Sequence, residues 1–167
     1  MDRDLDRLVE RTRSRSMARG AVSLRAAYLF TAAQAGIWLI VLSQLLPDSW
    51  PSNAAPLLFL VWLYPFTKRI TDYAQVMLGV TLGWVVPIGA AVVGIDALHQ
   101  GSGVEWEGLM GLYLVYVTWA VIHDTAYAHQ DLRDDLKAGI KSMAVRLLRR
   151  PKALLWVLAV LQVGLLG

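Results

Sequence analysis

The sequence predicts an all-α protein, a polytopic bundle of transmembrane helices. Residues AVILMFWYC make up 56% of the 167 residues, and charged residues make up 17%, whereas soluble domains average about 25% charged residues. The apolar residues gather in long blocks with the charges confined between them. The basic residues also fall only in alternate connecting segments. Together these observations indicate a chain embedded in a lipid bilayer and exclude an ordinary soluble domain.

Four apolar blocks have the length and composition expected of membrane helices, which need about 20 mostly apolar residues. They are Leu24–Leu46, Tyr73–Ile95, Glu107–Ala128 and the shorter Ala153–Gly167. Pro87 predicts a kink in the second block, because proline removes a helical hydrogen bond. A fifth segment, Ala54–Phe66, is short for a span, yet we expect it to cross as a tilted helix.

The distribution of basic residues supports that fifth crossing. If Ala54–Phe66 crosses, all 16 Lys and Arg lie on one side of the membrane, in Met1–Ser23 with the adjoining Arg25, Thr67–Asp72 and His129–Lys152. The opposite loops, Pro47–Asn53 and Asp96–Trp106, contain none. Such asymmetry is typical of cytoplasmic or matrix-facing loops. We therefore expect one membrane-embedded domain, residues 1–167, in an integral multi-pass protein, with the organelle (mitochondrial inner membrane or an ER-type membrane) left open.

Two clusters of aspartates lie on the predicted basic side. Each contains a pair spaced four residues apart, Asp2 with Asp6 and Asp131 with Asp135, and that spacing places both carboxylates on one face of a helix. Mg²⁺ prefers oxygen ligands and is commonly shared with phosphate oxygens of a substrate. Nearby basic residues, Arg11, Lys68 and Lys141, would offset the charge of such a group. Spacing alone favours catalysis no more than solvated charges at helix ends.

Two further patterns have ordinary explanations that compete with function. Tyr64 and Lys68 form another pair four residues apart, and a lysine extending past an aromatic ring towards water is the simpler interpretation. His123 and His129 flank Asp124, but a metal site needs three or four converging ligands. The chain has no cysteine, which excludes disulfides and thiolate metal sites.

Three stretches resemble the UbiA superfamily of intramembrane prenyltransferases, in family order and over most of the chain. DRDLDRLVERTRSRSMARG (2–20) resembles the end of the family's NDxxDxxxD motif and its following VxRTxxRPLxxG. YPFTKRITDYAQVMLGVTLGWVVP (64–87) resembles YPxxKRxTxxPQxxLGxxxxWxxP. DTAYAHQDLRDDLKAGIKS (124–142) resembles the second aspartate motif, DTxYAxxDxxDDxxxGxKS. The residues of these stretches are most similar to those of the 4-hydroxybenzoate polyprenyltransferase branch. The third stretch also resembles fungal enzymes that prenylate polyketide-derived phenolic acids in meroterpenoid biosynthesis.

The resemblance implies an enzyme that transfers a prenyl group from a polyprenyl diphosphate to a ring carbon of a hydroxybenzoate or phenolic acid, with Mg²⁺ as cofactor. It also implies a role for each matching residue. The metal ligands and catalytic residues would be Asp2, Asp6, Asp131 and Asp135, and the diphosphate would contact Arg11, Tyr64, Lys68 and Lys141. Asp124 and Asp134 belong to the motif with less defined roles. Its partners would be these substrates and the bilayer, and not a nucleic acid.

The sequence also departs from the family pattern. Asp2 follows Met1 directly, so the family's Asn and leading Asp would precede this chain, and the family has further spans beyond Gly167. Ser16 and Ala74 stand where the family usually has proline. We therefore expect a domain incomplete at both ends, with weak or no activity by itself. The alternative is a non-catalytic, decayed membrane homologue or fragment, while a transporter is disfavoured because the spans carry few ionisable groups.

Overall fold

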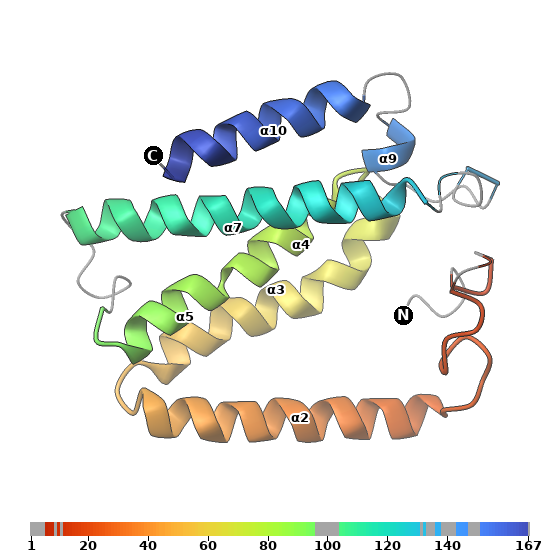
Figure 1. The fold of residues 1–167 in the computed structure, drawn as a ribbon. Coiled ribbons are helices and arrows are strands. Elements are labelled where there is room, and N and C mark those ends of the chain that lie inside the picture. Colours follow the sequence, from red (N-terminus) through yellow and green to blue (C-terminus); the bar gives the residue numbers. More distant parts are fainter. Residues whose placement is uncertain are drawn as a thin grey trace.

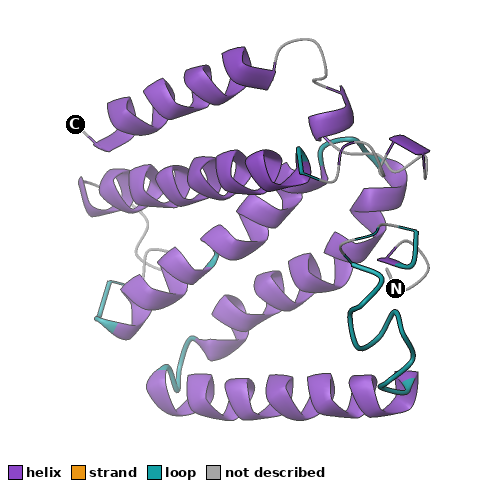
Figure 2. Cartoon of the chain, turned by 45° about the vertical axis from the view of Figure 1, so that its right-hand side comes forward, coloured by secondary structure: helices purple, strands orange, loops and turns teal. Residues whose placement is uncertain are grey.

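The computed structural model describes residues 6–8, 10, 12–95, 104–130, 132, 136–137, 143–146 and 151–166. Within those residues every regular element is a helix, and no strand occurs (Figure 2). This confirms the predicted all-α class.

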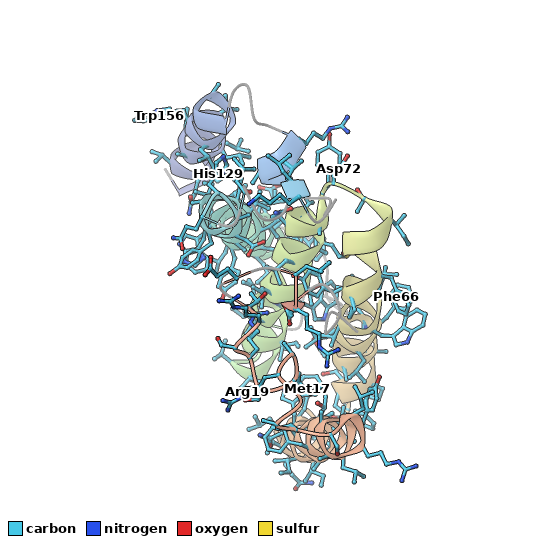
Figure 3. All side chains as sticks on the ribbon, turned by 90° about the vertical axis from the view of Figure 1, so that its right-hand side faces the viewer. Met17, Arg19, Phe66, Asp72, His129 and Trp156 are labelled. Carbon is cyan, nitrogen blue, oxygen red and sulfur yellow. The ribbon has the colours of Figure 1, made fainter. Side chains whose placement is uncertain are left out.

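The helices follow one another in alternating directions, so that each long helix returns beside the previous one (Figure 1). Neighbours in the chain are also neighbours in space, with α4 packed most extensively on α7. The elements are α2 (Leu24–Leu45), α3 (Trp50–Ile70), α4 (Ala74–Gly83), α5 (Val85–Val92), α7 (Val104–Ala128), α9 (Met143–Arg146) and α10 (Pro151–Leu166). Viewed along their axes, the long helices form an open, curved row rather than a closed bundle (Figure 3).

Three of these segments are long and apolar enough to cross a membrane: Leu24–Leu45, Ala74–Val92 and Trp106–Ala128. Large apolar side chains on the helices point outward, among them Leu29 and Trp156, which are 73% and 72% exposed. Trp156 points away from the other helices (Figure 3). Exposed apolar surface of this extent is unfavourable in water and favourable in lipid. The chain is an integral, multi-pass membrane protein.

Helix α3 is longer than the predicted segment Ala54–Phe66. It extends from Trp50 to Ile70, 21 residues, which corresponds to about 30 Å at 1.5 Å per residue. Polar residues bound the apolar block, but the helix continues through them. The Asn53 side chain donates to the Ser49 carbonyl at 3.0 Å, and Thr67 Oγ1 donates to the Tyr64 carbonyl at 2.6 Å. At this length α3 can cross a hydrocarbon core about 30 Å thick. The expected tilt was the wrong explanation for a short span, because tilt reduces the reach of a helix across the membrane.

The predicted interruption of the Tyr73–Ile95 block is present, but it lies one turn before Pro87. Helix α4 ends at Gly83 and α5 begins at Val85, with Trp84 in a turn between them. Pro87 has no N–H to donate to the Gly83 carbonyl, and its ring crowds that same carbonyl. The Trp84 indole Nε1 donates to the Asn53 carbonyl at 2.9 Å, which fixes the junction against α3.

Two glycines allow α4 and α7 to pack closely. A Cβ on Gly79 would lie 2.8 Å from the Val117 carbonyl oxygen, and one on Gly83 would lie 3.0 Å from both the Tyr113 ring and a methyl of Val117. Small residues spaced four apart are a common solution for close helix contacts in membranes. This contact fixes α4, which follows Lys68 in the chain, against α7, in which the second aspartate stretch begins.

Candidate diphosphate and metal site

Described parts of the three stretches that carry the family resemblance lie at the same end of the helix row. The N-terminal segment, the end of α3 with the start of α4, and the end of α7 with α9 all lie at the right-hand end in Figure 1. The N-terminal segment lies there between α2 and α7, and Met17 and Arg19 mark it in the end-on view (Figure 3). The connection after α2 and residues 93–95, which follow α5, lie at the opposite end. This arrangement agrees with the predicted sidedness, including the crossing by α3.

Asp6 is the one predicted metal ligand whose placement is described, and its carboxylate is already oriented by a partner. Arg15 Nη1 donates to Asp6 Oδ1 at 3.0 Å, and the Asp6 side chain is 19% exposed. The Thr12 hydroxyl donates to the Asp6 carbonyl at 2.8 Å. Arg15 was not among the predicted site residues, because a contact between residues nine apart in a series of turns follows no helical or strand periodicity.

The N-terminal segment forms turns that fold back on themselves ahead of α2. Arg7 Nε donates to the Ala18 carbonyl at 2.8 Å, and the Ala21 amide donates to the Ser16 carbonyl at 2.9 Å. Gly20 has a φ of 80°, a left-handed conformation that glycine adopts without the steric cost paid by other residues. The left-handed conformation explains the glycine at the end of the stretch that resembles VxRTxxRPLxxG. Ser16 stands at the position of that motif's proline, and it accepts through its carbonyl, as a proline could.

Tyr64 and Lys68 both lie near the C-terminal end of α3, at the same end of the molecule as Asp6 (Figure 1). Tyr64 is half-buried. The backbone of Lys68 is one turn further along the same helix, so the two residues share a helical face. The structure thus brings this pair to the predicted end, while the Lys68 side chain lies outside the described atoms.

The second aspartate stretch begins in the last turns of α7 and includes a partly buried imidazole, that of His129. His129 Nδ1 lies 2.7 Å from the Thr125 carbonyl oxygen. A carbonyl can only accept, so Nδ1 carries the proton and Nε2 of the neutral ring is an acceptor. Nε2 of His129 and Oγ1 of Thr125 are both buried, with no hydrogen-bond partner among the residues that the structure describes.

The two histidines do not converge on one site. His123 stacks on Trp119 with ring centroids 5.2 Å apart and contacts Tyr127 at 4.8 Å. It forms part of an aromatic row along one side of α7. His129 is six residues further on, which is about 120° around a helix from His123.

A second group of contacts, also missed from the sequence, joins α9 to the connection between α3 and α4. Arg146 Nη1 donates to Asp72 Oδ2 at 2.8 Å, and the Arg146 guanidinium lies 5.3 Å from the centre of the Tyr73 ring. The hydrogen bond to Asp72 and the electrostatic contribution of Tyr73 raise the pKa of Arg146 above its usual value. These partners are 73 and 74 positions apart, a separation at which no sequence periodicity pairs residues.

The remaining predicted site residues lie outside the described residues. They are Asp2, Arg11, Asp131, Asp135 and Lys141, together with Asp134 of the motif. Asp124 is described and lies half-buried in the last turns of α7.

The donor chemistry at this end suits a hard divalent cation. Asp6 offers carboxylate oxygens, and within the part of the chain that the structure describes, Arg15 donates to one of them, Oδ1. Mg²⁺ is bound in proteins through one or two carboxylates together with substrate phosphates. Among the described residues no group of three or more His, Asp or Glu side chains could hold a metal by itself, so Asp6 would act with ligands from the second aspartate stretch.

An apolar pocket of about 510 Å³ lies between α5 and α7, at the end opposite the aspartates. It is lined by Val85, Val86, Gly89, Ala90, Val93, Ile95, Gly108, Leu109 and Leu112. It offers no charged or polar side chain, so it is not a site for diphosphate or Mg²⁺.

Comparison with known proteins identifies the relatives of this chain. It is 42% identical over 166 residues to the mitochondrial 4-hydroxybenzoate polyprenyltransferase of Schizosaccharomyces pombe, covering 99% of this chain and 45% of that protein. It is 37% identical to the 4-hydroxybenzoate octaprenyltransferase of Providencia stuartii, covering 99% of this chain and 54% of that one. A prenyltransferase of Penicillium roqueforti is 40% identical over 87% of this chain and 44% of its own length.

The chain thus spans about half the length of these curated relatives. No solved structure gives a significant match. The profile of the UbiA prenyltransferase family matches residues 1–167, and the chain belongs to that family.

Proposed function

We propose that the protein transfers a prenyl group from a polyprenyl diphosphate to a ring carbon of a 4-hydroxybenzoate-type aromatic acid, in a Mg²⁺-dependent reaction. The observation that carries this proposal is that the N-terminal segment, the end of α3 and the end of α7, which belong to the three family stretches, lie at one end of a membrane-embedded helix row (Figure 1). The relatives named for 4-hydroxybenzoate supply the acceptor class. A phenolic acid of the fungal type is the second candidate, favoured by the Penicillium roqueforti relative.

In the proposed reaction the chain binds the diphosphate and keeps water away from the cation that forms. Asp2, Asp6, Asp131 and Asp135 would hold Mg²⁺, which when bound offsets the negative charge of the diphosphate. Arg11, Lys68 and Lys141 add positive charge around the leaving group, and Tyr64 orients it. Asp6 is suited to this role because Arg15 fixes its carboxylate at the end of the bundle where α3 also ends.

Departure of the diphosphate breaks the allylic C–O bond and leaves an allylic cation. The electron-rich ring carbon of the acceptor then forms a C–C bond with that cation, and the substituted carbon loses its proton. The apolar surfaces of the helices exclude water, which would otherwise capture the cation as an alcohol.

The first test is prenyl transfer in membranes that contain the protein, supplied with Mg²⁺, prenyl diphosphates of several lengths and a panel of hydroxybenzoates and orsellinic-type acids. We expect prenylated product that disappears when EDTA removes the metal. Because relatives are about twice as long, the chain is assayed alone and joined to the remaining helices of a relative. Absence of product from both forms would favour a non-catalytic homologue.

Substitution Asp6→Asn tests the role of the described carboxylate. We expect a loss of about 100-fold in transfer rate, in the range seen when one group that stabilises developing charge is removed. Asp48→Asn is the matched control, because Asp48 is an exposed carboxylate at the opposite end of the helix row. Equal activity of the two variants would contradict a role for Asp6.

A further inference from the structure

Helix α9 is attached to the connection between α3 and α4 and to the first turn of α4 by three contacts, which we call the α9 clasp. It consists of Asp72, Tyr73 and Gln75 on one side and Met143 and Arg146 on the other. Arg146 donates to Asp72 at 2.8 Å and stacks over the Tyr73 ring at 5.3 Å. The Met143 amide donates to Gln75 Oε1 at 3.3 Å.

The Gln75 contact is the buried part of the clasp. Gln75 is 4% exposed, and Met143 and Ala144 beside it are 5% and 0% exposed. Met143 is the first residue of α9, and the first amides of a helix have no acceptor within the helix itself. Gln75 supplies an acceptor for the Met143 amide from another helix, so this hydrogen bond joins α9 to α4.

In the chain, both sides of the clasp adjoin parts of the candidate site. Asp72 and Gln75 come four and seven residues after Lys68, just beyond the end of α3 at Ile70. Met143 comes directly after the second aspartate stretch, 124–142. The stretch thus begins within α7, and Met143, the residue that follows it in the chain, is attached by the clasp to the segment that follows Lys68.

We propose that Asp72, Gln75 and Arg146 are positioning residues, which set the second aspartate stretch at the distance from Lys68 that binding of a Mg²⁺–diphosphate group requires. The proposal rests on the diphosphate chemistry of the proposed function. The ion pair between Arg146 and Asp72 contributes little to the stability of the fold, because the two side chains are 55% and 31% exposed. In this proposal the pair instead fixes the position of α9, as residues that do not touch a metal can orient its ligands.

The test measures binding rather than turnover. Protein in membranes is treated with trypsin at increasing Mg²⁺ in the presence of inorganic diphosphate, and cleavage after Arg133, Lys137 and Lys141 is followed by mass spectrometry. For the unmodified protein we expect protection with a defined Mg²⁺ midpoint. Asp72→Asn, Arg146→Gln and Gln75→Met should each raise that midpoint by about tenfold, the lower end of the cost of losing a partner that orients metal ligands.

Charge reversal distinguishes positioning from damage to the fold. The double variant Asp72→Arg with Arg146→Asp should restore most of the midpoint that either single change loses, because the ion pair is rebuilt in the opposite sense. Asp48→Asn and Arg25→Gln are controls, since both residues are exposed and outside the clasp. They should leave the midpoint unchanged.

The outcomes separate this proposal from the proposed function. Shifted midpoints in a protein that makes no prenylated product would support the clasp and reject the transferase activity. Midpoints equal to that of the unmodified protein would overturn the clasp even if transfer is observed. Absence of any protection in the unmodified protein would overturn it as well, because there would be no diphosphate site to position.

Discussion

At the scale of single residues, Arg15 is the strongest addition that the structure makes to the predicted site. Its contact with Asp6 is 3.0 Å, with the arginine side chain 54% exposed. A pair this exposed contributes about 0–1 kcal/mol to stability. Its effect on the orientation of the carboxylate is independent of that small energy.

Substitution Arg15→Gln should therefore reduce prenyl transfer by about tenfold, as loss of a group that orients a metal ligand does, while thermal unfolding in detergent changes little. Arg13→Gln is a matched control. Arg13 is two residues before Arg15 and makes an exposed ion pair with Glu10 at 3.4 Å. Initial rates and unfolding midpoints are measured for both variants. Equal rates for the two would show that the Asp6 contact has no role in the reaction.

The same scale shows what the sequence could and could not predict about the site. Asp6, Tyr64 and the backbone of Lys68 lie at the predicted end of the molecule, because motif order and charge distribution together determine sidedness. Arg15, Gln75 and Arg146 were not among the predicted site residues, although Arg15 and Gln75 match the second Arg of VxRTxxRPLxxG and the Gln of YPxxKRxTxxPQxxLGxxxxWxxP. Their partners are contacted across turns or between separate helices, and such contacts depend on the tertiary fold rather than on local periodicity. Asp2, Asp131, Asp135, Arg11 and Lys141 remain predictions.

At the scale of helices, each of the five apolar blocks corresponds to helical structure in the predicted order, and three of them are long and apolar enough to cross a membrane. The differences in the helices concern their ends. Helix α3 gained length at both ends relative to Ala54–Phe66, because side-chain hydrogen bonds of Asn53 and Thr67 to the backbone allow polar residues to remain helical. The break near Pro87 moved to Trp84, since a proline disturbs the turn before it. The pairing of α4 with α7 was not predicted, although Gly79 and Gly83 have the spacing of close-packed membrane helices.

That pairing can be tested with a glycine substitution. Gly79→Ala would place a Cβ 2.8 Å from the Val117 carbonyl, so α4 and α7 must separate, and we expect a loss of about 1–3 kcal/mol in unfolding free energy. Gly36→Ala, with no atom within 4 Å of the added Cβ, should instead be neutral or stabilising by up to about 1 kcal/mol. Circular dichroism during thermal unfolding in detergent measures both. A stable Gly79→Ala protein would contradict the close contact.

At the scale of the whole molecule, the arrangement of basic residues and the path of the helices agree. The N-terminal segment, with Arg7, Arg13, Arg15 and Arg19, lies at the same end as the last turn of α3 and as α9 with Arg146 (Figure 1). The connection that contains Asp48 lies at the other end. Helix α3 is the decisive element, because it is less apolar than the three segments that qualify as spans by hydropathy, and only its crossing places all basic segments together.

The absence of cysteine makes that crossing directly measurable. Single variants Arg19→Cys, Asp48→Cys and Ile70→Cys introduce a thiol before α2, before α3 and at the end of α3, each at an exposed position. In sealed vesicles of known orientation, a membrane-impermeant maleimide should label the first and third from one side and the second from the other. Labelling of Asp48→Cys and Ile70→Cys from the same side would mean that α3 does not cross. Lys68 would then lie opposite the basic N-terminal segment, and a diphosphate site shared by Asp6 and Lys68 would be impossible.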